Sequence, residues 1–170
     1  AIRAISAELT PKLIGLDSTT RTDPAETLLP AIREAIVGAN AQVYAQAEKN
    51  PHWRGMGSTV VVAAVVGNQV YVGHVGDSRL YLINMGGISQ KTEDHSIVHR
   101  LVKMGVIQPE EAETHPQRDV LTKAVGTQRN VEPDTLSFSL TPGDTLLLCS
   151  DGLTKLLTDA EIHAIIQNDV

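Results

Sequence analysis

The sequence predicts an α+β fold in which antiparallel sheets are covered by helices. Two helical patterns come first, within residues 1–47, and consecutive strand patterns then follow over residues 58–92 without a helix between them. Helical patterns return after residue 95 and also close the chain. A parallel sheet would require strands and helices to alternate, so this order favours antiparallel sheets with helical cover.

The two N-terminal helices are predicted from apolar side chains at three- and four-residue spacing. The first helix covers residues 1–14, and its apolar stripe consists of Ile2, Ile5, Leu9 and Leu13. A polar loop is expected over residues 15–21. The second helix begins after Asp23, a capping acid that precedes a proline at the first helical position. Its apolar face runs to about Ala47 and includes Leu28, Ile32, Ala35, Ile36, Ala39 and Val43.

The pattern then changes to that of strands. Strands are expected over residues 58–66 and 69–76, joined by Gly67-Asn68, which favours a hairpin turn. Two further strands, over residues 79–84 and 88–92, continue this meander.

A second hairpin is predicted nearer the C-terminus. Residues 134–140 and 145–150 have strand patterns, and Pro142 and Gly143 occupy suitable places in the turn between them. The remaining helices are expected over residues 96–104, from Pro109, and after the capping box Thr158–Glu161.

Two aspartates are predicted to lie at strand ends beside glycines. The apolar run of residues 145–149 indicates a buried strand that leads to Asp151 and Gly152. A second strand ends at Gly76, and Asp77 follows it. A carboxylate is costly to bury unpaired, and rigidly held oxygen ligands suit a hard divalent cation. The residues alone leave two interpretations of Asp151 open: a metal ligand, or an acid that caps the following helix.

Five blocks of the sequence, in this order, resemble the metal-dependent serine/threonine protein phosphatase family, type 2C (PPM), in its bacterial style. They are residues 57–59, 75–79, 93–96, 119–126 and 148–153. The resemblance implies a four-layer α/β/β/α sandwich of antiparallel sheets, incomplete at both ends. It further implies a single truncated domain over residues 1–170, with a helical flap inserted at about residues 95–125.

The resemblance also implies a chemistry: metal-dependent hydrolysis of phosphoserine and phosphothreonine in proteins by a water that Mg²⁺ or Mn²⁺ activates. Two or three ions are implied for the complete domain. Asp151 matches a metal-bound aspartate of the family. Asp77 matches the Gly-Asp-Ser-Arg aspartate, which in bacterial members helps to hold an additional ion and otherwise supports the site without contacting the metal. No catalytic residue beyond these metal ligands is expected in the chain. Arg79 is expected to pair with a nearby acid.

Several elements of the family are missing from this sequence. They are the first acidic strand with its phosphate-gripping arginine, the Asp-Gly-Met-Gly-Gly block and the terminal Asp-Asn. The chain is therefore expected to be the interior of such a domain and to be inactive alone. A non-catalytic type 2C-like binding or regulatory module stays open as the alternative.

Two other phosphatase chemistries fit the residues less well. A cysteine phosphatase needs Cys-x5-Arg, but the sixth residue after Cys149 is Lys155, which lacks the fork that binds phosphate. A haloacid-dehalogenase-type enzyme would have its nucleophilic aspartate where Cys149 lies, and it would need alternating strands and helices.

Composition narrows the range of partners. The net charge of −6 over 170 residues argues against binding to nucleic acid, because the phosphate backbone attracts basic patches. The longest apolar run, residues 60–66, is far shorter than the ~20 residues that cross a bilayer. Cys149 is the only cysteine, which favours a reducing compartment. We therefore expect a cytoplasmic monomer that acts on a phosphorylated protein, without a membrane or nucleic-acid partner.

Overall fold

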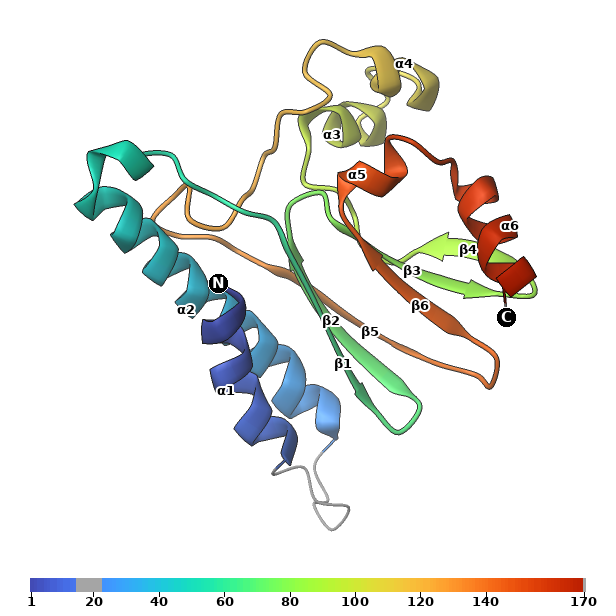
Figure 1. The fold of residues 1–170 in the computed structure, drawn as a ribbon, viewed down its shortest axis with the longest axis horizontal. Coiled ribbons are helices and arrows are strands. Elements are labelled where there is room, and N and C mark those ends of the chain that lie inside the picture. The colour runs from blue at the N-terminus through green and yellow to red at the C-terminus, as the bar shows by residue number, and fades with distance from the viewer. Residues whose placement is uncertain (15–22, 170) are drawn as a thin grey trace. The chain divides into compact units, whose positions relative to one another are not determined.

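A computed structural model describes residues 1–14 and 23–169, which fall into two compact units (Figure 1). The first unit comprises residues 1–76 and 123–139, and the second comprises residues 77–122 and 140–170. The polar loop predicted at residues 15–21 lies outside the described residues. Within the described part of the chain, no helix is both long and apolar enough to cross a membrane.

Two helices cover the sheet of the first unit. Helix α1 (Ile2–Ile14) packs against α2 (Pro24–Lys49), and the short 3-10 helix η1 (Pro51–Trp53) follows α2 (Figure 1). The predicted start of α2 is confirmed, because the Asp23 carboxylate accepts a hydrogen bond from Ala25 N at 2.9 Å. The apolar stripe of α1 is shorter than predicted, since Ile2 is 78% exposed whereas Ile5 is buried.

The sheet of the first unit contains three antiparallel strands in the order β1-β2-β5. These strands are β1 (Val60–Val66), β2 (Gln69–Val75) and β5 (Asp134–Ser139). The α2 helix contacts all three strands, and Gly73 of β2 lies directly against it. A Cβ atom at Gly73 would collide with Ile32, so the absence of a side chain permits this close packing.

A buried asparagine connects α2 to the segment before β5. The Asn40 side-chain oxygen accepts a hydrogen bond from Gly126 N at 2.7 Å, and its nitrogen donates to the carbonyls of Gln128 and Arg129 at 3.1 Å each. Gly126 has φ +88°, a conformation that favours glycine. Asn40 thus satisfies three backbone groups that burial would otherwise leave without partners.

The second unit is built on another three-stranded antiparallel sheet, in the order β4-β3-β6. Its strands are β3 (Arg79–Asn84), β4 (Gly87–Gln90) and β6 (Thr145–Cys149). Its helices are α3 (Ile97–Lys103), α4 (Pro109–Thr114), α5 (Asp151–Thr154) and α6 (Asp159–Asp169). The buried side chains of Tyr81, Ile83 and Ile162 form its core between the sheet and α6.

The hairpin predicted over residues 134–150 is wrong. Its two strands form, but β5 pairs with β2 and β6 pairs with β3, so they belong to different sheets. The turn itself is present: Asp144 N donates to Thr141 O at 3.0 Å, and the Asp144 carboxylate accepts from Thr141 N at 2.8 Å. Turn residues specify a local reversal of the chain, whereas pairing depends on side chains across the strands, such as Leu80 opposite Leu148.

The predicted α+β class with antiparallel sheets is confirmed. The first hairpin and the meander that follows it are confirmed as well, with strand ends within two residues of those predicted. Helices α3 and α4 lie in the segment predicted as a flap, at about residues 95–125. The single domain and the role of that insertion stay predictions.

Candidate metal centre

The register of β3 and β6 brings the two predicted ligands to the same end of one sheet. The last pair of this antiparallel ladder is Arg79 opposite Cys149. Two residues beyond that pair on each strand are Asp77, just before β3, and Asp151, just after β6. Neither aspartate is itself part of the ladder, because Asp77 precedes β3 and Asp151 is the first residue of α5. The register nevertheless brings both segments to the same end of the sheet.

The electrostatics of Asp77 agree with this placement. Burial raises the pKa of the Asp77 carboxyl above its usual value of 3.8, and the negative charge of Asp151 raises it further. The charge of Asp94 also raises the pKa of Asp77, whereas the Lys155 ammonium lowers it. A partly buried carboxylate beside a second negative charge forms a place where a bound cation is electrostatically favourable.

The backbone before Asp77 needs a glycine. Gly76 has φ +107°, and a Cβ atom at this position would collide with Thr59. The Gly-Asp pair therefore has a steric cause: the chain turns at Gly76 and then presents the carboxylate of Asp77 at the end of the sheet.

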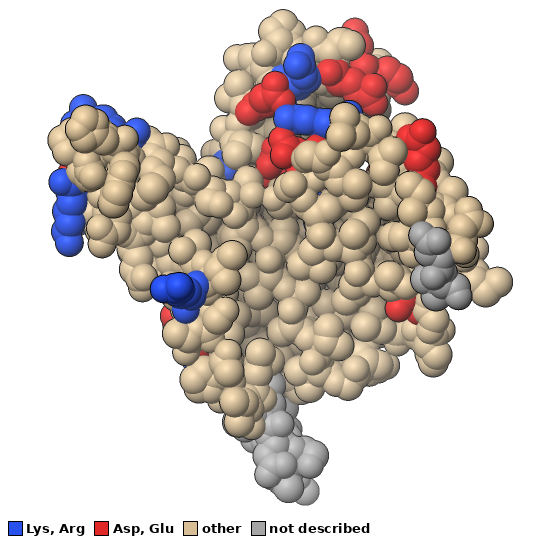
Figure 2. Space-filling model, viewed as in Figure 1, with Lys and Arg blue, Asp and Glu red and all other residues tan. Residues whose placement is uncertain are grey.

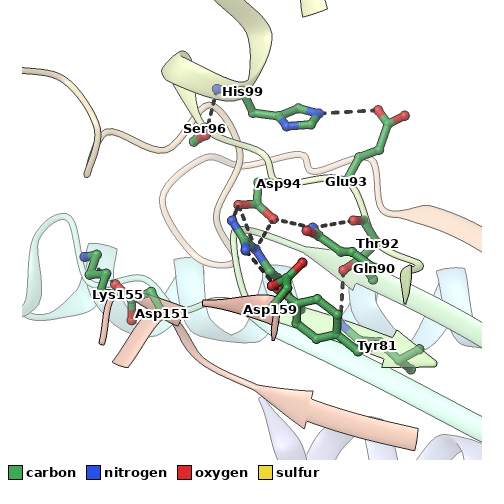
Figure 3. A network of polar contacts seen from close by, with 12 residues as sticks. Tyr81, Gln90, Thr92, Glu93, Asp94, Ser96, His99, Asp151, Lys155 and Asp159 are labelled. Carbon is green, nitrogen blue, oxygen red and sulfur yellow. Dashed lines mark hydrogen bonds and ion pairs between the residues drawn. The ribbon is translucent and has the colours of Figure 1, made fainter. Parts of the chain in front are cut away.

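Asp151 is not the cap of the helix that follows it. The N-cap of α5 is Ser150, and Asp151 is the first helical residue. The Asp151 carboxylate instead accepts a hydrogen bond from Lys155 Nζ at 2.6 Å, one turn further along (Figure 3). Lys155 Nζ also lies 2.7 Å from Oδ1 of Asp119. Lys155 thus joins Asp151 to Asp119 within the second unit.

Sequence reasoning missed the roles of Lys155 and Asp119. The Asp151–Lys155 spacing of four residues is a signal for an ion pair on a helix, so this contact could have been predicted. Asp119 comes from the segment after α4, and no local spacing relates it to Lys155.

A polar network holds the start of β3 beside this site (Figure 3). Arg79 Nε donates to both oxygens of Asp94 at 2.9 and 3.1 Å, and Nη2 donates to Oδ2 at 2.7 Å. Arg79 Nη1 also donates to the Tyr81 hydroxyl, which donates in turn to Asp159 at 3.0 Å. The prediction that Arg79 pairs with a nearby acid is confirmed. Burial alone would lower the pKa of Arg79, but the bonds to Asp94 outweigh it and raise the pKa.

The chemistry of the donors fits a hard cation. Asp77 and Asp151 offer only oxygen, and Mg²⁺ takes one or two carboxylates from a protein while it keeps several waters. The one nearby sulfur does not compete, because burial raises the pKa of the Cys149 thiol and disfavours its thiolate. The same effect argues against Cys149 as the nucleophile of a cysteine phosphatase.

Comparison with known proteins matches this chain to one protein family. The family described as Protein phosphatase 2C matches residues 7–101. The serine/threonine phosphatase stp of Listeria welshimeri is 40% identical over 150 residues, which are 88% of this chain and 60% of that protein. The chain thus spans about 60% of the length of this curated relative.

Solved structures agree with the sequence match. The crystal structure of the serine/threonine phosphatase Stp1 from Staphylococcus aureus has a TM-score of 0.82 and 42% identity, over 98% of this chain and 64% of that one. The catalytic domain of the serine/threonine protein phosphatase PstP, in complex with two manganese ions, has a TM-score of 0.71 and 33% identity. That match covers 97% of this chain and 67% of that domain.

Proposed function

Because this chain belongs to the protein phosphatase 2C family, we propose that its protein hydrolyses phosphoserine and phosphothreonine in phosphoproteins with the help of Mg²⁺ or Mn²⁺. The observation that carries this proposal is the placement of Asp77 and Asp151 at one end of the β3–β6 pair. Manganese in the related PstP domain supports the choice of ion.

The residues of this chain would hold and position the ion. Asp77 and Asp151 would supply carboxylate ligands from strand ends, where the backbone is held by the sheet. The bonds of Arg79 to Asp94 and Tyr81 would fix the first residue of β3 and thereby limit the movement of Asp77. A bound ion supplies positive charge for the phosphoryl oxygens and a water of lowered pKa. The other ligands and the phosphate-binding arginine of the family have no counterpart in this sequence, so the 170-residue chain alone would have little turnover.

The segment at about residues 95–125 would shape access for the substrate. Helices α3 and α4 contact each other, and the last part of the segment is irregular. Segments of this kind often determine specificity, while the scaffold carries the chemistry. We further propose that the protein is a cytoplasmic monomer and that its macromolecular partner is a phosphorylated protein substrate.

The alternative function, a non-catalytic binding or regulatory module, is favoured by one observation. Lys155 already places one positive charge between Asp151 and Asp119, so these carboxylates have a partial counter-charge without an ion. Activity separates the two functions. The protein that carries this chain should release phosphate from a phosphothreonine peptide with millimolar Mn²⁺, and Asp151→Asn should abolish that release.

The matched control is Glu93→Gln. Glu93 also accepts a hydrogen bond from a lysine, Lys103, at 2.6 Å in the same unit, and it also loses its charge in the variant. Its activity should stay within about twofold of the original, because the exposed contacts of Glu93 with Lys103 and His99 each contribute only ~0–1 kcal/mol to stability. Absence of turnover with Mn²⁺ in a folded protein that has the full length of its relatives would favour the binding module.

A further inference from the structure

The ammonium group of Lys155 lies between two carboxylates of the candidate metal centre. Nζ is 2.6 Å from Oδ2 of Asp151 and 2.7 Å from Oδ1 of Asp119. Lys155 closes α5 at its C-terminal end, whereas Asp119 comes from the segment after α4. In Figure 2, acidic side chains gather over the region of α3, α4 and α5, with basic side chains among them. Lys155 is thus a cation held by the side chains that surround the site.

This contact occupies one oxygen of the carboxylate that is proposed to bind the ion. A magnesium ion binds its oxygen ligands at about 2.1 Å, and a lysine ammonium donates to carboxylates at about 2.7–2.9 Å. Both cations prefer the lone pairs of the Asp151 carboxylate, and their positive charges repel each other at this distance. An ion at Asp77 and Asp151 therefore competes with the ammonium group.

Lys155 carries a positive charge and has a flexible, partly exposed side chain. A lysine side chain is ordinarily in its ammonium form at neutral pH. Its side chain is 51% exposed, and the flexible four-carbon stem of lysine can change rotamer without opening a cavity. Asp119 offers a second carboxylate that can retain the ammonium group after it leaves Asp151.

We propose that Lys155 is a tethered cation that occupies the place of a divalent ion at Asp151 and must withdraw towards Asp119 when Mg²⁺ or Mn²⁺ binds. This inference rests on the proposed metal site. Its consequence is a higher concentration threshold for the ion, because each binding event displaces an internal ion pair. The ammonium group would reduce the negative charge of the site at low metal concentration.

The test measures Mn²⁺ binding to the 170-residue chain rather than activity. Free Mn²⁺ is quantified by electron paramagnetic resonance, and NMR line broadening of the amides of residues 77 and 151 assigns the site. Lys155→Gln should lower the Kd for Mn²⁺ about threefold to tenfold, the factor expected for the loss of one or two exposed ion pairs. Lys155→Arg keeps the charge and should leave the Kd within about twofold.

The matched control is Lys103→Gln. Lys103 has the same 2.6 Å contact with a carboxylate, Glu93, in the same unit, and its side chain is 63% exposed. This variant changes the net charge equally, so a similar decrease of the Kd in it would overturn the proposal in favour of a general charge effect. A Kd that stays unchanged or rises in Lys155→Gln, with broadening at residues 77 and 151, would overturn the tethered cation but keep the metal site. No broadening at either residue in any variant would refute the metal site and this inference with it.

Discussion

Asp77 and Asp151 each lie two residues beyond Arg79 and Cys149, the last pair of one antiparallel ladder, at the same end of that ladder. The two carboxylates come from positions 74 residues apart in the sequence, the difference between 151 and 77. The strand register brings them to the same end of the sheet, and the charge of Asp151 raises the pKa of Asp77. Such mutual repulsion is costly in the folded protein and becomes useful when a cation binds.

The stability of the chain should therefore depend on pH through Asp77. The pKa of Asp77 is raised in the folded state, so the folded chain binds this proton more tightly than the unfolded chain. This contribution to stability is fully present below the unfolded pKa, near 3.8, and is lost as the pH rises through the higher folded pKa. Asp77→Asn should therefore unfold at higher urea than the original chain at pH 7 without divalent ions.

Mn²⁺ should reverse that order. An ion that binds only the folded chain stabilises it by mass action, and Asp77→Asn lacks one ligand. Millimolar Mn²⁺ should raise the urea concentration at which the original chain unfolds but should not raise it for the variant. Equal stabilisation of both by Mn²⁺ would mean that Asp77 is not a ligand.

The Arg79–Asp94 pair should contribute more to stability than an exposed ion pair. Arg79 and Asp94 are 27% and 12% exposed, and their contact is bidentate. Asp94→Asn should lower the free energy of unfolding by about 2–4 kcal/mol, because it weakens the partner of a largely buried charge. Glu93→Gln, next to it in sequence, should cost no more than about 1 kcal/mol. Equal costs in urea unfolding would contradict the assigned role of Arg79.

Asn40 should be required for the stability of the first unit. Asn40→Ala removes the partner of Gly126 N and of two carbonyls, and leaving such buried groups unsatisfied costs about 1–3 kcal/mol. Gln42→Ala on the exposed side of the same helix should change the free energy of unfolding by less than about 0.5 kcal/mol. A urea midpoint for Asn40→Ala equal to that of Gln42→Ala would show that these hydrogen bonds are dispensable.

Glycines 73 and 38 should respond oppositely to alanine. Gly73→Ala places a methyl group against Ile32 and should destabilise the chain by about 1–3 kcal/mol. Gly38 lies inside α2, and a Cβ atom at this position would have its nearest neighbour, an oxygen of Glu8, at 3.6 Å. Gly38→Ala should therefore stabilise the helix by up to about 1 kcal/mol. Thermal unfolding measures whether each variant raises or lowers the unfolding temperature. A lower unfolding temperature for Gly38→Ala would contradict the described packing of α2.

Local patterns predicted the elements well because each has a local cause. The Asp23 cap, the Gly67-Asn68 turn and the Thr158–Glu161 capping box all form at the predicted positions. The partner of a strand has no local cause. The residues of β5 and β6 flank a good turn, yet each strand finds its partner elsewhere in the chain.

The candidate site likewise contains residues that a local sequence pattern predicts and contacts that only the fold brings together. Asp77 and Asp151 were predictable, because an acid beside a glycine at a strand end is visible in the sequence. The contact between Asp119 and Lys155 was not, since 36 positions separate the two residues in the sequence and only the fold brings them together. Asn40 was missed for a related reason: its partners are backbone groups, which leave no trace in the sequence.

The central claim is that Asp77 and Asp151 bind one hard divalent ion together. A crystal of the chain grown with Mn²⁺ and measured at the manganese absorption edge tests it most directly. The account predicts an anomalous peak about 2.1–2.2 Å from an oxygen of each aspartate, close to the bond lengths of Mg²⁺, with waters at the other positions. A peak elsewhere, or a fully Mn²⁺-saturated crystal with no peak beside these two carboxylates, would contradict it.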